Sequence, residues 1–400
     1  MAELKKKKVI AKKTKKVTVK KVTPKKSRVK VTAKKTTKKI VKKIVKKTHP
    51  VLIKKFIGNP IMEPSPHSPW ESEAVFNPAA VVHDGRIHLF YRALGHDGMS
   101  RIGYASSSDG INFYERLPHP VYVAEEINDA MAHYPYTSPA RLVYDPVLYA
   151  SGGGWGGCED PRAVKIDGQI YLTFNMFNGW ESMRVGVTSI SGESLSAKKW
   201  NWSKFTYLSR PGDRQKNWVL FPEKINGKFA LFHNLDLGDA SRVHIAYLDD
   251  LNMYKTPTQA EAPDVHTLPD HIVAWHNRTR SAAAPPIKTK EGWLLFYHAM
   301  DKDDPNRYKV GALLLDLKDP TRVLYRANHP ILEPDMWYEN DWKPGIIYAS
   351  GAVVKDGTLF IYYGGGDKRI AVAHTNLEEF LKKLKTGKNI VFSKKSIKNL

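Results

Sequence analysis

Hydrophobic and polar residues alternate along most of the chain after residue 56, and short polar turns interrupt the alternation. One unit recurs: a hydrophobic strand, a turn in which Asp, Asn or Glu precedes Gly, and a second strand rich in aromatic residues. A period of two is typical of β-strands, and Asp-Gly or Asn-Gly between two such runs is typical of a tight hairpin. The unit occurs five times, at residues 81–92, 163–174, 223–233, 287–298 and 352–363.

The spacing of these units predicts the fold class. Their turn glycines stand at positions 85, 168, 227, 292 and 357, so successive units are 59 to 83 residues apart, enough for one four-stranded antiparallel sheet with its loops. We therefore predict an all-β chain folded as a five-bladed β-propeller. A pair of β-sandwiches is the competing architecture, but it gives no reason for five similarly spaced hairpins. Helix is expected only at residues 376–385, where the Leu and Phe spacing suits a short amphipathic segment.

Charge separates the first 50 residues from the rest. Residues 1–50 contain 22 Lys and Arg residues and one acid, Glu3, whereas residues 51–400 contain 41 basic and 39 acidic side chains. Lysine pairs separated by Val, Thr and Ile cannot bury enough apolar surface to offset the entropy of ordering. We predict a disordered Lys-rich N-terminal arm at 1–50 and a propeller domain at 51–400. The arm would bind nucleic acid or another polyanion without sequence preference, or act only as a solubilising extension.

The remaining composition narrows the protein class. No apolar run is long enough to span a bilayer, and the start lacks the apolar segment of a secretory signal, so no membrane partner is expected. The single cysteine, Cys158, excludes an internal disulfide framework and fits a reducing compartment, which predicts a cytoplasmic protein. No His, Cys and Asp cluster has the spacing of metal ligands, so no catalytic metal is expected.

A glycine-rich stretch leads into the candidate catalytic group. Five glycines within residues 152–157 precede Glu159-Asp160-Pro161-Arg162, and glycines let the backbone approach a ligand closely. The carboxylate of Asp160 is a plausible acid for sugar or phosphate chemistry, or one half of a structural salt bridge with Arg162. Inner strands of a propeller end at a central funnel, where polar residues are costly unless they bind a ligand. The repeats place six polar residues at or beside such strand ends: Asn77, Arg92, Asp160, Asn217, His298 and Asp367.

Six motifs, in register along the chain, carry a resemblance to a known family. They are Phe76-Asn-Pro-Ala79, Phe90-Tyr-Arg-Ala93, Cys158-Glu-Asp-Pro-Arg162, Lys216-Asn-Trp-Val-Leu-Phe-Pro-Glu-Lys224, Pro285-Pro286 with Gly292-Trp-Leu-Leu-Phe-Tyr-His298, and Tyr362-Tyr-Gly-Gly-Gly-Asp367. Over residues 57–381 the chain resembles glycoside hydrolase family 130, whose phosphorylases and hydrolases act on β-mannosides. That family folds as a five-bladed propeller, in agreement with the number of repeats.

The resemblance implies roles for individual residues. Asp160 would be the general acid that protonates the leaving glycosidic oxygen through the 3-hydroxyl of the bound sugar. Asn77, Arg92 and Asp367 would hold the mannosyl unit by its hydroxyl groups, and Asn217 completes the expected substrate-binding set. The positions of the family's phosphate site are occupied or adjoined here by Lys216, Arg278, Arg280 and His298.

These positions favour phosphorolysis over hydrolysis. An inverting hydrolase needs a second carboxylate as base, whereas phosphate is already an anionic nucleophile and needs cations to hold it. We predict an inverting β-mannoside phosphorylase that uses inorganic phosphate as co-substrate, needs no cofactor and releases α-mannose 1-phosphate. Two alternatives stay open: a β-mannosidase whose base is Glu181 or Glu223, and a carbohydrate-binding propeller without catalysis.

Aromatic residues and one long connection complete the candidate site. Trp155, Tyr134 and Tyr136 can offer a flat face to a sugar ring, or they fill the core between blades. His233 is expected to be a hydrogen-bonded strand-end histidine. Residues 116–157 are expected to form a lid that shapes the acceptor end of the site.

Overall fold

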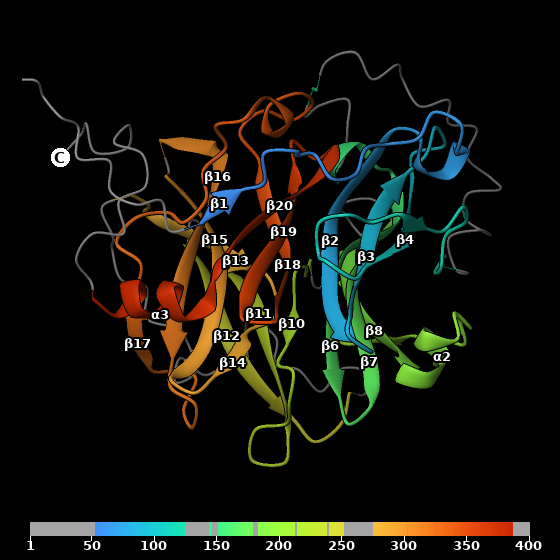
Figure 1. Cartoon of the computed structure of the whole chain (residues 1–400). Coiled ribbons are helices and arrows are strands. Elements are labelled where there is room, and N and C mark those ends of the chain that lie inside the picture. Colours follow the sequence, from blue (N-terminus) through green and yellow to red (C-terminus); the bar gives the residue numbers. More distant parts are fainter. Residues whose placement is uncertain are drawn as a thin grey trace, which may run out of the picture. The chain divides into compact units, whose positions relative to one another are not determined.

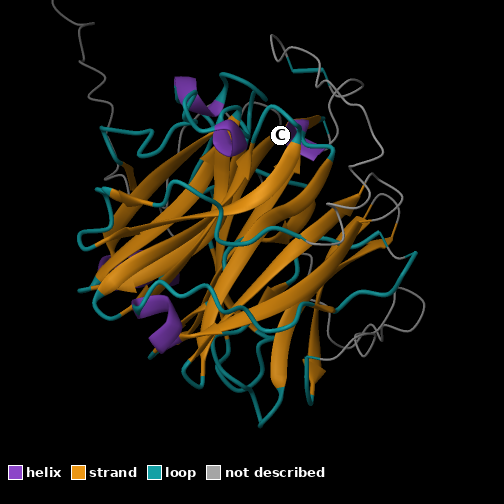
Figure 2. Ribbon diagram, turned by 90° about the vertical axis from the view of Figure 1, so that its right-hand side faces the viewer, coloured by secondary structure: helices purple, strands orange, loops and turns teal. Residues whose placement is uncertain are grey.

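The computed structural model describes residues 53–124, 144–145, 151–178, 183–212, 214–237, 240–251, 275–301 and 303–386. Strands make up nearly all of the regular structure in these residues, and helical turns are few (Figure 2). The all-β prediction is therefore confirmed. Contacts divide the chain into Met1–Thr48 and His49–Leu400, and every described residue belongs to the second unit. The predicted basic arm at 1–50 lies outside the described residues, and its boundary stays a prediction.

The first two repeats form one sheet of eight strands. Its first half is an antiparallel meander of β2 (Ala74–His83), β3 (Arg86–Leu94), β4 (Met99–Ser107) and β5 (Glu115–Arg116). The second half is another, made of β6 (Gly156–Ile166), β7 (Gln169–Asn178), β8 (Met183–Ser191) and β9 (Thr206–Tyr207). The two halves join only where β4 and β6 pair in parallel, Met99 with Gly156 and Ser100 with Gly157. Gly157 is required there because a Cβ atom would lie 2.1 Å from the Ser100 carbonyl oxygen.

The other three repeats form three further antiparallel sheets (Figure 1). The third repeat gives β10 (Val219–Leu220), β11 (Phe229–Leu237) and β12 (Ala240–Leu248). The fourth gives β13 (Arg278–Ala282), β14 (Ile287–Thr289), β15 (Gly292–Asp301), β16 (Asp304–Leu315) and β17 (Val323–Arg326). The fifth gives β18 (Ile347–Lys355), β19 (Thr358–Gly365) and β20 (Arg369–Asn376), and β1 (Lys54–Lys55) pairs with β20. None of the described sheets closes on itself.

Four of the five predicted turns have the backbone that Asp-Gly and Asn-Gly favour. Both turn residues have positive φ in the turns Asp84-Gly85, Asp167-Gly168, Asn226-Gly227 and Asp356-Gly357. The fourth turn differs, because its first residue is Glu291 and only Gly292 has a positive φ, of 149°. Thr289 stabilises that turn instead: its hydroxyl donates to the Gly292 carbonyl oxygen (2.7 Å) and accepts from the Glu291 amide (3.2 Å).

Helices are short and lie at the edges of the strands. The predicted C-terminal helix is confirmed as α3 (Leu377–Lys385), which begins where the Asn376 side chain accepts a hydrogen bond from the Glu379 amide. A second helix, α2 (Gly192–Ser196), is not predicted by the sequence pattern, and Ser191 caps it. Short 3-10 turns occur at η1 (Pro69–Glu71), η2 (Ser151–Gly153) and η4 (Trp337–Glu339). None of the described helices is long and apolar enough to cross a bilayer.

Hydrophobic clusters lie between successive repeats. Phe90 and Phe174 belong to the cluster between the first and second repeats, and Val187 and Leu231 to the one between the second and third. Similar clusters join the third repeat to the fourth and the fourth to the fifth. Leu89 of β3 and Tyr362 of β19 share another, which joins the fifth repeat to the first. Each sheet thus has both faces covered by apolar neighbours, as burial of these side chains requires.

Candidate active site

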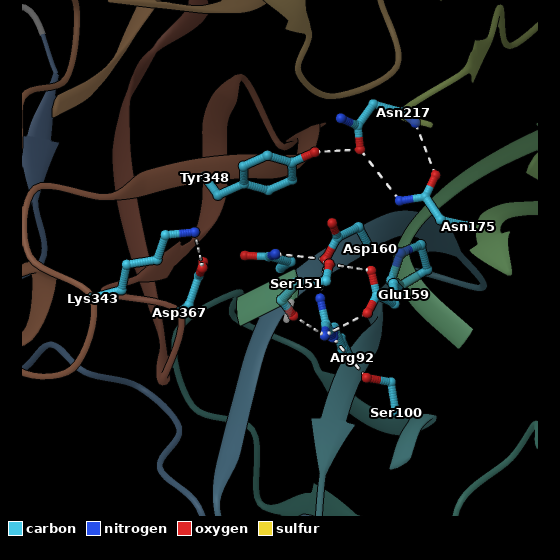
Figure 3. A network of polar contacts seen from close by, with 12 residues as sticks. Arg92, Ser100, Ser151, Glu159, Asp160, Asn175, Asn217, Lys343, Tyr348 and Asp367 are labelled. Carbon is cyan, nitrogen blue, oxygen red and sulfur yellow. Dashed lines mark hydrogen bonds and ion pairs between the residues drawn. The ribbon is translucent and has the colours of Figure 1, made fainter. Parts of the chain in front are cut away.

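A cavity of about 210 Å³ collects side chains from all five repeats. Its lining residues are Asn77, Arg92, Tyr144, Ser151, Gly152, Asp160, Lys216, Asn217, Arg280, Tyr308, Lys343, Ile346, Tyr348 and Asp367. Seven of the nine predicted site residues are among them. Several of these side chains and their hydrogen bonds are drawn in Figure 3.

Local breaks in the strands turn these side chains toward the cavity. The pairing of β2 with β3 shifts register around Asn77, and the pairing of β6 with β7 shifts around Asp160. Both residues have positive φ, 48° for Asn77 and 51° for Asp160, and each is followed by proline. Asn and Asp tolerate this left-handed backbone better than other non-glycine residues. A β-bulge changes the direction of a side chain, so bulges of the same kind orient the Asn77 amide and the Asp160 carboxyl.

The Asp160 carboxyl is buried against donors. Its Oδ1 accepts a hydrogen bond from Asn77 Nδ2 at 2.6 Å and faces Arg92 Nη1 at 3.4 Å. Burial acts to raise the pKa of Asp160, but Arg92, the Asn77 hydrogen bond and further cations outweigh burial and hold that pKa below its usual value of 3.8. Asp160 therefore binds a proton less readily than an ordinary aspartate does.

Arg92 is enclosed by polar groups and by the glycine-rich stretch. Its Nε donates to Ser100 Oγ (2.9 Å), and its Nη2 donates to the Ser151 carbonyl oxygen (2.6 Å) and to Glu159 Oε1 (2.8 Å) (Figure 3). The chain passes so close that a Cβ atom on Gly154 would lie 2.8 Å from Arg92 Nη2. Gly154 therefore allows a close approach of the backbone to the Arg92 side chain, whereas the sequence pattern predicted an approach to a ligand.

Three cationic side chains line the cavity in addition to Arg92. Lys216, Arg280 and Lys343 all line it, and Lys343 Nζ lies 3.0 Å from Asp367 Oδ2. Burial, followed by repulsion from Arg280, lowers the pKa of Lys216 to about 8. Burial also acts to lower the pKa of Lys343, but its carboxylate partner Asp367 raises the pKa above the usual value. Lysine and arginine that repel one another in a partly buried cavity favour binding of an anion.

The Tyr348 hydroxyl forms hydrogen bonds with Asn217 and Arg162. It donates to Asn217 Oδ1 at 2.5 Å and accepts from Arg162 Nη2 at 3.1 Å. The Arg162 guanidinium also donates to the backbone oxygens of Asp160 and Ala283, so it links the second repeat to the fourth. Its contacts near Asp160 are with the backbone oxygens of Asp160 and Pro161 and not with the Asp160 carboxylate, unlike the structural salt bridge considered from sequence.

Two predicted phosphate ligands are not brought to the cavity. His298 is fully buried behind Tyr348, with the two rings stacked 4.3 Å apart. Its Nε2 accepts the Ala349 amide at 2.9 Å, and its Nδ1 lies 3.2 Å from Ser281 Oγ, so the ring is neutral with its proton on Nδ1. Burial lowers the pKa of His298 well below its usual value. Arg278, at the start of β13, does not line the cavity, whereas Arg280 at the register shift of that strand does.

The predicted aromatic residues of the site do not line the cavity or lie outside the described residues. Trp155 packs against Gly98, where a Cβ atom would lie 2.4 Å from its ring, and it does not line the cavity. Tyr134 and Tyr136 lie outside the described residues, as does most of the expected lid at 116–157. His233 is buried, and its Nδ1 has no hydrogen-bond partner among the described residues. That it is a hydrogen-bonded strand-end histidine stays a prediction.

Sequence reasoning missed several lining residues. They are Tyr144, Ser151, Gly152, Tyr308, Lys343, Ile346 and Tyr348. The connection that holds Lys343 has no alternating pattern and no motif, so nothing in the sequence marked it. No group of three or more His, Cys, Asp and Glu that could hold a metal ion occurs among the described residues.

Comparisons with known proteins point to one family. The model of the family described as beta-1,4-mannooligosaccharide phosphorylase matches residues 36–386. A 1,2-beta-oligomannan phosphorylase of Thermoanaerobacter sp. (strain X514) is 35% identical over 339 residues, which cover 82% of this chain and 99% of the relative. A beta-1,2-mannobiose phosphorylase of the same strain is 34% identical over 335 residues, covering 80% of this chain and 96% of the relative.

Solved structures share the fold. The beta-1,2-mannobiose phosphorylase from Listeria innocua, solved in complex with beta-1,2-mannobiose, superposes with a TM-score of 0.61 at 23% identity, covering 84% of this chain and 99% of that one. A putative glycosidase from Bacteroides thetaiotaomicron superposes with a TM-score of 0.62 at 24% identity, covering 81% of this chain and 97% of that one. On the extent of the family match and the identity to these relatives, the chain belongs to glycoside hydrolase family 130.

Proposed function

We propose that the chain is an inverting β-mannoside phosphorylase. Inorganic phosphate attacks the anomeric carbon of a non-reducing β-mannosyl unit, and the glycosidic bond to the acceptor sugar breaks. Asp160 supplies the proton that the leaving oxygen takes up, relayed by the 3-hydroxyl of the mannosyl unit. The products are α-mannose 1-phosphate and the shortened acceptor, with phosphate as co-substrate and no further cofactor.

The observation that carries this proposal is one cavity lined by the Asp160 carboxyl together with Lys216 and Arg280. Phosphate needs no base to activate it, but it needs cations that hold it in line with the bond that breaks. Burial and repulsion from Arg280 outweigh the attraction of Asp160 and Glu159 and lower the pKa of Lys216, and a bound phosphate anion would offset both. Arg278 and His298 are left out of the proposed phosphate ligands, because neither lines the cavity.

The neutral sugar is proposed to bind beside Asp160. Asn77, Arg92, Asn217 and Asp367 line the cavity there and offer amide, guanidinium and carboxylate groups. Charged and amide partners suit sugar hydroxyl groups, because each hydroxyl both donates and accepts. Lys343 holds the Asp367 carboxylate by their ion pair, so that residue accepts from the sugar in a fixed orientation.

Hydrolysis is not favoured. Glu223, one of the two candidate bases, forms an ion pair with Lys288 at 2.6 Å and does not line the cavity. Glu181, the other, lies outside the described residues. The two described carboxylates on the cavity are Asp160 and Asp367, and Asp367 is engaged by Lys343. A non-catalytic carbohydrate-binding protein would not need this cluster of cations.

We also propose that the five repeats are the blades of a propeller. Supporting this, β2 packs against both β6 and β18, and apolar clusters join each repeat to the next and the fifth to the first. The pairing of β1 with β20 would then fasten the two ends of the domain together. An experimental structure with five sheets around one axis would test the arrangement.

Two expectations lie outside the described residues or beyond the comparisons. Polyanion binding by residues 1–50 stays a prediction, which is tested by comparing salt-dependent DNA binding of the whole chain and of a chain lacking these residues. A cytoplasmic location also stays a prediction.

The substrate proposed first is a β-1,2-linked mannoside, because the relatives at 34–35% identity are named for that linkage. The test incubates the whole chain with β-1,2-mannobiose, with and without phosphate. Mannose 1-phosphate is expected only when phosphate is present, with the α configuration by NMR. Release of free mannose without phosphate would instead indicate a hydrolase.

Asp160→Asn tests the acid. We expect kcat to fall by about 10²- to 10⁴-fold, the usual contribution of a general acid, because an amide cannot supply the proton. Asp167→Asn is the matched control, since Asp167 also has positive φ but lies in an exposed hairpin turn and does not line the cavity. Wild-type turnover by Asp160→Asn would remove Asp160 from its role.

A further inference from the structure

A second carboxyl group stands next to the acid but faces away from the cavity. Glu159 is fully buried and does not line the cavity, although it adjoins Asp160 on β6. Its Oε1 accepts from Arg92 Nη2 at 2.8 Å, and its Oε2 accepts from Ser151 Oγ at 2.6 Å (Figure 3). Buried carboxyl groups are rare unless a group of opposite charge pairs with them, and Arg92 is that partner for Glu159.

The contacts of Arg92 are divided unequally between the two carboxyls. Its close ion pair, at 2.8 Å, is with Glu159, while Asp160 Oδ1 lies 3.4 Å from Nη1. Ser100 and the Ser151 backbone hold the same guanidinium in its plane. The arginine is therefore drawn toward Glu159, and Asp160 is left with the weaker contact.

The net charge of these three groups shows how the pairing of Arg92 affects protonation of Asp160. With both carboxyls ionised, Glu159, Asp160 and Arg92 together carry one negative charge, so one proton makes the group neutral. Without the Glu159 charge, a proton on Asp160 would leave the buried guanidinium without a counter-charge. An uncompensated buried charge is costly, so protonation of Asp160 would become less favourable.

We propose that Glu159 is a positioning residue for the acid: it holds Arg92 and balances its charge, so that the single proton shared by the two carboxyls can reside on Asp160 during turnover. This inference rests on the role of Asp160 in the proposed phosphorolysis. No bond forms to Glu159, and the proton that Asp160 gives to the leaving oxygen is regained from solvent after each turnover.

The electrostatics of the pair agree with the geometry. Burial, opposed by Arg92 and helped by the negative charge of Asp160, raises the pKa of Glu159 to about 7. The pKa of Glu159 is thus raised and that of Asp160 lowered, so a proton shared by the two carboxyls binds more readily to Glu159. Bound phosphate adds negative charge on the cavity side, which favours transfer of that proton to Asp160. The groups that face Glu159 are Arg92, Ser151, Asp160, Lys216 and the neighbouring thiol of Cys158.

The test replaces Glu159 by glutamine, which keeps the shape and removes the charge. For β-1,2-mannobiose phosphorolysis by Glu159→Gln we expect kcat at pH 7 to fall at least about tenfold. In a plot of kcat against pH, the alkaline limb should move at least about one pH unit toward acid. The reason is that Asp160 alone then binds the proton, and its pKa is lower without the Glu159 charge. The KM for mannobiose should change little. Glu71→Gln is the matched control: Glu71 is a buried carboxyl bonded to Tyr91 and Arg116, away from the cavity, and its removal should leave the pH profile unchanged.

A second substrate separates loss of acid catalysis from general damage. A dinitrophenyl β-mannoside has a leaving group that needs no proton, so Glu159→Gln should turn it over within about threefold of the wild-type rate. Glu159→Asp keeps the charge and should keep the wild-type alkaline limb at reduced kcat, which provides the measurement if the glutamine variant does not fold.

The outcomes distinguish this inference from the proposed function. If the wild-type chain releases no mannose 1-phosphate from any mannoside, the proposed phosphorolysis fails. If the wild type is active but Glu159→Gln keeps its pH profile, or loses equal activity on both substrates, only the role of Glu159 is overturned. A limb displaced in Glu159→Asp as far as in Glu159→Gln would overturn it as well.

Discussion

Removing the amine of Lys216 should weaken phosphate binding specifically. The perturbation is Lys216→Met, which keeps the apolar stem and removes the charge that lines the cavity near Arg280. A charge-assisted hydrogen bond contributes about 1.5–3 kcal/mol, and the Coulomb attraction of two unit charges at 4 Å is about 4 kcal/mol at an effective dielectric constant near 20. Loss of Lys216 also relieves its repulsion of Arg280, which offsets part of the loss. We therefore expect about 2–3 kcal/mol, or roughly a 30- to 150-fold rise in the KM for phosphate.

The pH dependence gives a second magnitude for the same residue. The pKa of Lys216 is about 8, so its cation is present below that pH and is lost as pH rises through it. In the wild type, the KM for phosphate should therefore rise above pH 8, at most about tenfold per pH unit. Lys216→Arg keeps its charge at all these pH values, so its KM should stay flat over the same interval.

The assay is the initial rate of mannose 1-phosphate release at saturating mannobiose and varied phosphate. Lys288→Met serves as the control, because Lys288 is half exposed, pairs with Glu223 and does not line the cavity. The reasoning would be refuted if Lys216→Met bound phosphate like the wild type. It would also be refuted if the KM for mannobiose rose in place of the KM for phosphate.

Two further substitutions probe the walls of the cavity. Tyr348→Phe leaves Asn217 and Arg162 without a hydroxyl partner, so we expect a loss of about 1–3 kcal/mol of unfolding free energy and a higher KM for mannobiose, measured by denaturant titration and initial rates. Gly154→Ala places a Cβ atom 2.8 Å from Arg92 Nη2, so we expect about 1–3 kcal/mol of destabilisation and a reduced kcat. Unchanged activity would show that the backbone shifts to accommodate the methyl group.

Local pattern predicted the strands and hairpins well, because a hairpin is decided by neighbours in sequence. Four turns of Asp-Gly or Asn-Gly have the expected positive φ at both residues, and only Glu291-Gly292 departs. Alternation could not predict that β4 and β6 pair in parallel over two residues, because that contact depends on two repeats meeting in space.

The site was predicted where motifs mark it and missed where they do not. Asp160 and Lys216 stand in recognisable motifs, and both line the cavity. Lys343 lies in an irregular connection, and its approach to Asp367 is a tertiary contact that no spacing reveals. His298 was expected at or beside a strand end, but it lies inside β15, three residues before its end, and its ring stacks on Tyr348 instead of lining the cavity.

Backbone conformation explains why the polar ligands were hard to separate from turn residues. Asn77, Asp160, Asn217 and Asp367 all have positive φ, as do the hairpin residues Asp84 and Asp167, so residue type alone does not distinguish a ligand from a turn. In the first two repeats the next residue does distinguish them: glycine follows in the turns, and proline follows Asn77 and Asp160 at the bulges. The same conformation decides how the acid must be tested. Alanine at position 160 would remove the carboxyl and also incur about 1–2 kcal/mol of backbone strain in the left-handed region, so it would confuse chemistry with geometry. Asparagine tolerates that conformation, and Asp160→Asn therefore removes the acid without adding backbone strain.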